Sequence, residues 1–104
     1  MKSSNYGQRQ EQKVARQLRG HGAKVTMSPG SRGPADVKAR FPSGKSWNVQ
    51  VKSSRTGIPA SPSAKELGRL KISASRTGAT PVVAKVTPKG TSYKSARSGR
   101  TLKP

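Results

Sequence analysis

Four polar side chains in the first half of the sequence have the chemistry that a metal-dependent hydrolase uses. Glu11 and Asp36 are two of only three acidic residues, and carboxylate oxygens are hard ligands that suit Mg²⁺. Gln50 and Lys52 are two positions apart, so on a strand both side chains point the same way. A lysine beside a phosphate stabilises developing charge while a metal activates the attacking water. These residue types suit hydrolysis of a phosphodiester.

The net charge indicates which partner the chain meets. Lys and Arg number 22 against 3 Asp and Glu, which gives a formal charge of +19 and an isoelectric point near 11.9. Such an excess of cations repels itself, and phosphates relieve the repulsion. Nucleic acid is therefore the first partner to consider. An anionic membrane surface is second, but the sequence has no Lys-rich amphipathic helix with a bulky apolar face.

Several other classes of protein are disfavoured. Cysteine is absent, which rules out disulfides and thiolate metal sites and fits a cytoplasmic protein. His21 is the single histidine, so a histidine-rich zinc site or a Ser-His-Asp triad has little to build from. The first twelve residues are polar rather than signal-like, and no segment has the apolar length that spans a bilayer.

The pattern of apolar and turn-forming residues predicts an α/β domain, with elements in the order α-β-β-β-α-β-(β). One predicted helix covers residues 5–20. A second opens at the capping-box spacing of Ser63 and Glu66 and ends near Gly78. The predicted strands cover residues 23–28, 35–41, 46–53 and 81–86, with residues 91–94 as a further edge strand.

Alternation along the two middle strands separates a polar face from an apolar one. Asp36 shares the polar face of its strand with Lys38 and Arg40. On the next strand, Gln50 and Lys52 lie together on the polar face. Residues 42–45 read as the hairpin turn between these strands. The hairpin thus presents an acid beside an amide and a lysine.

The remaining marked residues have structural interpretations. Glu11 lies on the apolar stripe of the first helix, where a carboxylate is costly unless a cation meets it. Glu66 is better explained as a helix cap than as a ligand. Phe41 and Trp47 are predicted core residues.

The chain is long enough for one small domain of 104 residues. Residues 1–87 are predicted to form it, and residues 88–104 are predicted to be a basic tail or edge strand, partly disordered. The hydrophobic content of 29% is low for a self-sufficient core. Either part of the chain is disordered or a dimer interface completes the burial.

Short motifs in a fixed order resemble a nuclease superfamily. They are Gly7-x-x-x-Glu11, Gly30-Ser31, Pro34-Ala35-Asp36 and Gln50-Val51-Lys52-Ser53. Their order, and their placement on a helix and a hairpin, resembles the PD-(D/E)XK nucleases, and within them the archaeal Holliday-junction resolvases. The resemblance covers roughly residues 5–86 and implies a restriction-endonuclease-like mixed β-sheet flanked by helices.

The resemblance also implies roles for individual residues. Glu11 and Asp36 would ligate Mg²⁺ or Mn²⁺, Lys52 would be the catalytic lysine, and Ser31 would belong to an active-site loop. The family usually has an acid where this chain has Gln50. A glutamine ligates through its carbonyl oxygen, and Mrr-like restriction nucleases are similar in using a Q-x-K form. The site then has two carboxylates and an amide as its metal ligands.

The function expected from these patterns is that of a metal-dependent, structure-selective DNA endonuclease. It would cut four-way junctions or related branched DNA in recombination and repair, as a homodimer because a junction offers two equivalent strands. Two alternatives remain open. One is a non-catalytic basic nucleic-acid-binding protein on a nuclease-like fold, and the other is a ribosome-associated protein. The predicted nucleic-acid contacts are Arg9, Arg16, Arg32, Lys38, Arg55, Lys89 and Lys94.

Each predicted site residue also has a simpler interpretation. Asp36 and Glu11 could pair with neighbouring cations on their own elements. Lys52 could be one phosphate contact among many, and Gln50 ordinary strand polarity. Ser31 could simply form a turn. The fold decides between these interpretations by showing which side chains meet.

Overall fold

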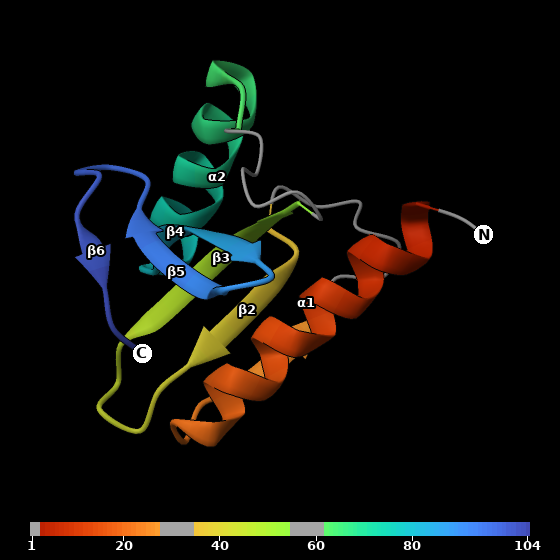
Figure 1. The fold of residues 1–104 in the computed structure, drawn as a ribbon. Coiled ribbons are helices and arrows are strands. Elements are labelled where there is room, and N and C mark those ends of the chain that lie inside the picture. The colour runs from red at the N-terminus through yellow and green to blue at the C-terminus, as the bar shows by residue number, and fades with distance from the viewer. Residues whose placement is uncertain (1–2, 28–34, 55–61) are drawn as a thin grey trace.

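A computed structural model describes residues 3–27, 35–54 and 62–104 of the chain. Within these ranges the elements follow one another as two helices and six strands, and Figure 1 shows their arrangement. They are α1 (Ser3–Gly20), β1 (Lys24–Met27), β2 (Val37–Arg40), β3 (Ser46–Ser53), α2 (Ala64–Thr77), β4 (Thr80–Thr87), β5 (Gly90–Ser95) and β6 (Thr101–Leu102).

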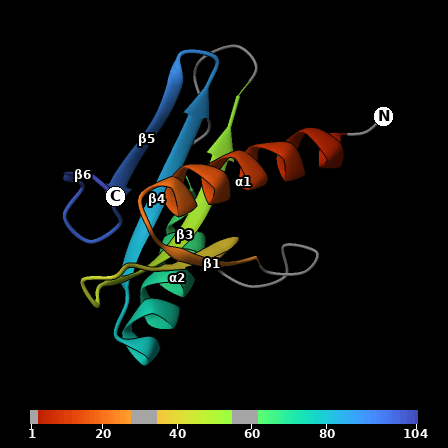
Figure 2. The same ribbon diagram turned by 90° about the horizontal axis from the view of Figure 1, so that it is seen from below.

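The six strands form one mixed sheet in the order β1-β2-β3-β4-β5-β6. Strands β3 and β4 are parallel, and every other neighbouring pair is antiparallel. Helix α2 makes the crossover that a parallel pair requires. Helices α1 and α2 cover opposite faces of the sheet (Figure 2). The predicted α/β class and mixed sheet flanked by helices are confirmed; β6 was not predicted.

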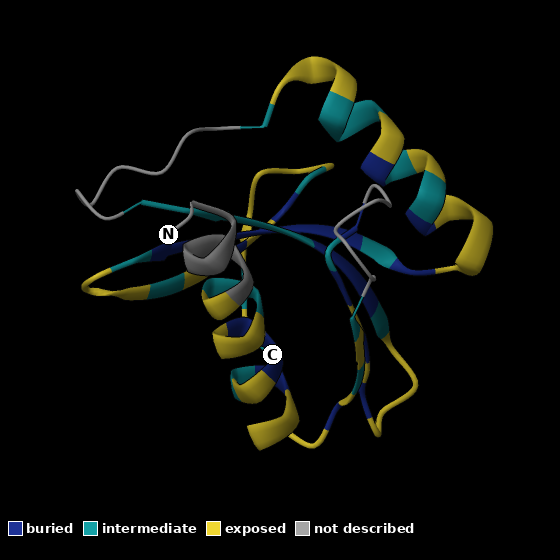
Figure 3. Cartoon of the chain, turned by 90° about the vertical axis from the view of Figure 1, so that its right-hand side faces the viewer, coloured by how far each residue is buried: buried dark blue, intermediate teal, exposed yellow. Residues whose placement is uncertain are grey.

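The larger part of the core lies between α1 and the sheet. The predicted stripe of α1 is buried, with Val14 and Leu18 fully enclosed against the strands. Trp47 is also buried there, as predicted, and its ring lies 5.0 Å from that of Phe41 at an interplanar angle of 68°. Edge-to-face contacts of this kind favour aromatic pairs beyond their buried area. The outward surfaces of both helices stay exposed (Figure 3).

The chain after Pro88 takes part in the sheet and the core. Tyr93 on β5 is buried, and its ring lies 5.6 Å from the Trp47 ring. The Tyr93 hydroxyl donates a hydrogen bond of 2.7 Å to Gln17 Oε1 on α1. Paired strands therefore occupy residues 90–95 and 101–102, where the sequence left open a tail or an edge strand. Pairing with β4 and the buried Tyr93 ring both tie β5 to the domain, where composition alone indicated little to bury.

A smaller core lies beneath α2. Leu70 is fully buried against Ala35 and Val83, and Asn48, which is 3% exposed, donates from Nδ2 to Ser73 Oγ at 3.1 Å. The alternation predicted from residue 35 is wrong at its first position. Ala35 packs under α2 rather than with the apolar face of β2, because the chain bends at residue 36 before the strand begins.

The ends of α2 are set by its sequence. Ser63 Oγ accepts from the Glu66 N–H and Glu66 Oε1 accepts from the Ser63 N–H, so the predicted capping box is confirmed. At the other end Gly78 has a φ of 70°, the left-handed conformation that glycine adopts without strain. The helix therefore begins and ends as the sequence predicts. None of the helices in the described ranges is long and apolar enough to cross a membrane.

Candidate functional site

The start of β2 and the end of β3 lie at the same end of the sheet because the two strands are antiparallel. Asp36 is fixed there by its backbone and its side chain. Its N–H donates to the Val49 carbonyl at 2.8 Å, and its Oδ2 accepts from the Val51 N–H at 2.9 Å. A carboxylate that accepts a hydrogen bond from the neighbouring strand in this way differs from the simpler interpretation, in which Asp36 pairs with cations of its own strand.

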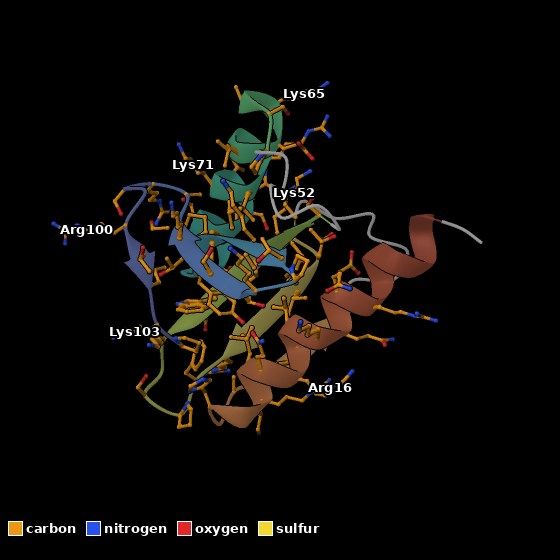
Figure 4. The ribbon with its side chains drawn as sticks, viewed as in Figure 1. Arg16, Lys52, Lys65, Lys71, Arg100 and Lys103 are labelled. Carbon is orange, nitrogen blue, oxygen red and sulfur yellow. The ribbon has the colours of Figure 1, made fainter. Side chains whose placement is uncertain are left out.

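Gln50 and Lys52 share one face of β3, as the strand period predicts. They also share one partner, the Glu66 carboxylate in the first turn of α2. Gln50 Nε2 donates to Glu66 Oε2 at 3.0 Å, and Lys52 Nζ lies 3.1 Å from the same oxygen. Figure 4 shows Lys52 at the end of β3, beside α2. Two elements therefore fix the position of the lysine.

Glu66 is the residue that sequence reasoning missed. It is a cap, as predicted, but its second oxygen anchors Gln50 and Lys52. The order of the elements could have revealed the contact between Glu66 and β3. A crossover helix between parallel strands starts near the carboxyl end of the first strand, and the cap spacing places Glu66 in the first turn of that helix. A cap and a site contact can therefore be the same side chain.

The two carboxyl groups have opposite electrostatic environments. Burial raises the pKa of Asp36 above its usual value; the Val51 N–H and the Lys52 charge oppose this rise, and the Glu66 charge adds to it. The Ser63 N–H, followed by Lys52, lowers the pKa of Glu66. Asp36 is thus the carboxyl group that gains most from a nearby cation, because a cation offsets the cost of keeping its charge in a half-buried place.

Two side chains at this end of the sheet, Asp36 and Gln50, carry oxygens of the type that ligates a divalent cation. Gln50 Oε1 is buried and has no hydrogen-bond partner among the described residues. A buried acceptor of that kind is costly and calls for a ligand or ordered water. One oxygen of Asp36 accepts from Val51, so the other carboxylate oxygen can serve a cation. Mg²⁺ suits such a site, since it usually keeps several waters and takes one or two protein oxygens together with substrate phosphate.

Glu11 lies on α1, one turn before the buried Val14, and is itself half-buried. In the part of the chain that the structure describes, no three His, Cys, Asp or Glu side chains gather closely enough to hold a metal. The chain has only three acids, so the described geometry does not place Glu11, Asp36 and Glu66 around one ion. The predicted role of Glu11 stays a prediction, and Ser31 lies outside the described residues.

The predicted nucleic-acid contacts are spread over the molecule. Arg9 and Arg16 are exposed on α1, while Lys38 is exposed on β2, Lys89 in the β4–β5 turn and Lys94 on β5. Arg32 and Arg55 lie outside the described residues. Figure 4 shows further cations on other elements, including Lys65 and Lys71 on α2 and Arg100 and Lys103 around β6. The positive charge therefore surrounds the domain rather than marking one face.

The chain thus has a mixed sheet with a helix on each face, and polar groups lie where β2 begins and β3 ends. The solved structure of Hjc, a Holliday junction resolvase from the archaeal hyperthermophile Archaeoglobus fulgidus, is similar to this chain with a TM-score of 0.75. The similarity covers 86% of this chain and 75% of that chain at 23% sequence identity. The fold expected from the PD-(D/E)XK resemblance is thereby confirmed. No protein-family model matches the sequence, and a search of the curated proteins found no match to it.

Proposed function

We propose that this chain is a metal-dependent, structure-selective DNA endonuclease that hydrolyses phosphodiester bonds in four-way or related branched DNA. One observation carries the proposal: Asp36, Gln50 and Lys52 lie at one end of the sheet, and none of the described residues offers a hydrogen-bond partner to the buried Gln50 Oε1 atom. The likeness of the fold to a junction resolvase supports the substrate class. The formal charge of +19 supports a phosphate-rich partner.

Each side chain has a distinct part in the proposed reaction. Asp36 and Gln50 would hold Mg²⁺ or Mn²⁺, which when bound polarises the phosphate and lowers the pKa of water. Lys52 would contact the scissile phosphate and stabilise the negative charge that builds up on its oxygens. Glu66 is a positioning residue, since it contacts Lys52 and Gln50 through one oxygen. A symmetric homodimer would offer two such sites to the two equivalent strands of a junction.

Incubation of end-labelled synthetic junctions with Mg²⁺ or Mn²⁺ tests the proposal. The native chain is expected to make paired cuts that disappear in Asp36→Ala and in Lys52→Ala, while both variants still bind the junction without metal. Lys65→Ala is the matched control because it removes an exposed lysine beside Glu66. Cutting that survives in both site variants contradicts the assignment.

A second candidate is a non-catalytic DNA-binding protein on the same fold. Gln50 in place of an acid favours it, as does the lack of three clustered metal-binding side chains among the described residues. If the chain has this function, it binds DNA with a steep salt dependence, and neither the native chain nor any variant cleaves the DNA. The same cleavage assay separates the two functions, because only the first one makes Asp36 necessary.

A further inference from the structure

Each helix leaves one corner of the sheet uncovered. Helix α1 packs on β1, β2 and β3, whereas α2 packs mainly on β3 and β4 on the opposite face (Figure 2). On the α2 side, neither of the two described helices packs mainly on β1 and β2. A shallow hollow of about 270 Å³ lies there, beside the carboxyl end of α2. Its lining includes the side chains of Lys24, Thr26, Lys38, Arg40, Ser46 and Thr77.

Three cations of this hollow stand together without a matching acid. Lys24 on β1 is directly opposite Arg40 on β2, and Lys38 follows one step along the same face. All three are exposed, and none of the residues lining the hollow is acidic. Like charges directly opposite each other on a sheet are destabilising. The pair of Lys24 and Arg40 therefore lowers the stability of the fold, and an anion seated between them would offset that repulsion.

The hollow and the candidate site both lie along β2 and β3. Lys38 and Arg40 are two positions apart on β2, and Asp36 comes just before that strand, at the bend. The stretch from residue 36 to residue 40 therefore spans at most about 13 Å at the usual rise of a strand. Lys38 is opposite Asn48, the neighbour of Gln50 on the polar face of β3. One strand of DNA carries a phosphate about every 3.4 Å along the duplex axis. The stretch from residue 36 to residue 40 is therefore about as long as three or four nucleotides.

We propose that the hollow formed by Lys24, Lys38 and Arg40 binds successive phosphates of one DNA strand and leads that strand to Asp36. The part of the inference that leads the DNA strand to Asp36 rests on the proposed function. The binding of phosphates in the hollow does not. In the described residues, Ile72 on α2 is the only large hydrophobic side chain that is exposed. The hollow thus offers cations but no exposed ring for stacking on a base. It would therefore contact the phosphates of the DNA whatever the base sequence.

Salt-dependent binding tests the inference with the full chain. Affinity for a synthetic four-way junction and for a plain duplex is measured by fluorescence anisotropy at several salt concentrations, with EDTA present so that no cutting occurs. Each phosphate contact adds about 0.9 to the slope of log affinity against log salt. Lys24→Gln/Arg40→Gln is expected to lower the slope by about 1.8, which corresponds to about 12-fold in affinity between 50 and 200 mM salt.

The matched control is Lys71→Gln/Arg100→Gln, which removes the same charge from α2 and from the residue before β6 (Figure 4). It is expected to keep a slope close to that of the native chain. An unchanged slope in the Lys24/Arg40 variant, or an equal drop in the control, overturns the inference. Because no metal is present, a failed binding test does not contradict the nuclease proposal. A lowered slope in a chain that does not cleave DNA still supports phosphate binding in the hollow.

Amide NMR of the native chain supplies a second measurement that does not depend on a variant folding. Titration with a short duplex is expected to shift the amide signals of Lys24, Lys38 and Arg40 together. Inorganic phosphate alone is the comparison, because it offers the same chemistry without a strand. Shifts produced by phosphate but not by DNA assign the hollow to a free anion, and the absence of any shift with either probe refutes a phosphate site.

Discussion

Glu66 gives the sharpest prediction because it links the stability of α2 to the position of Lys52. Glu66→Ala removes the acceptor of the Ser63 N–H and the shared partner of Gln50 and Lys52. The lost cap hydrogen bond costs about 0.5 to 1 kcal/mol. The ion pair adds about 0.2 to 1 kcal/mol, in the lower part of that range because solvent reaches 41% of the Glu66 side chain. The free energy of unfolding is expected to fall by about 1 to 2 kcal/mol in a urea titration.

Ser63→Ala separates the two roles of Glu66. It breaks the cap at a similar cost of about 1 kcal/mol, but it leaves the contacts to Lys52 and Gln50 in place. Cleavage of a labelled junction is expected to be unchanged in Ser63→Ala. It is expected to slow in Glu66→Ala by about fivefold, the equivalent of about 1 kcal/mol in the transition state. Equal cleavage rates in the two variants refute the positioning role.

The pH dependence of Glu66 provides an independent check. Its pKa is lowered from the ordinary 4.5, so its charged form stabilises the fold above that value. The contribution is lost as the pH falls through the lowered pKa of the folded state. Native chain and Glu66→Gln are therefore expected to differ in urea stability at neutral pH and to converge in acid. A difference that persists at the lowest pH contradicts the electrostatic origin.

Three further outcomes are expected. Burial raises the pKa of Tyr93 from 10.0 to about 12. The protonated hydroxyl therefore contributes fully to the free energy of unfolding below pH 10, and this contribution is lost as the pH rises toward 12. The stability advantage of the native chain over Tyr93→Phe should shrink by about 2 to 3 kcal/mol in that window, and an unchanged advantage in alkaline urea titrations contradicts this. Leu70→Ala should cost about 2 to 5 kcal/mol in the same assay, because Leu70 is fully buried beneath α2; a loss below 1 kcal/mol is inconsistent with the packing. Burial raises the pKa of Asp36 in the metal-free chain, and only the ionised carboxylate holds a cation. The apparent affinity for Mn²⁺ should therefore begin to fall on acidification at a higher pH than an ordinary aspartate dictates, and an affinity that does not change on acidification contradicts Asp36 as a ligand.

The hairpin and its polar face were predictable from the sequence because strand alternation is a local property. Asp36, Gln50 and Lys52 were selected by type and spacing, and antiparallel pairing brings the start of β2 to the end of β3. The first helix followed from its stripe, and the second from its cap and Gly78. In each case the chemistry of a few neighbouring residues determines the local structure.

Other features depend on contacts between distant segments, and local patterns do not encode them. Glu66 was correctly read as a cap, yet its contact with Lys52 follows from the crossover of α2 over β3. Tyr93 comes from a segment rich in Lys, Ser and Gly, and only the packed structure shows its ring in the core. Asn48 alternates as a surface residue but is buried under α2, where Ser73 satisfies its amide.

Paramagnetic broadening by Mn²⁺ tests the central claim most directly, because it locates the cation without requiring cleavage. In amide NMR of the native chain, substoichiometric Mn²⁺ is expected to broaden the signals of Asp36, Gln50 and Val51 first. The broadening is expected to disappear in Asp36→Ala and to persist in Lys65→Ala. Broadening confined to other parts of the chain, or unaltered by Asp36→Ala, contradicts a metal site at the end of the sheet where β2 begins and β3 ends.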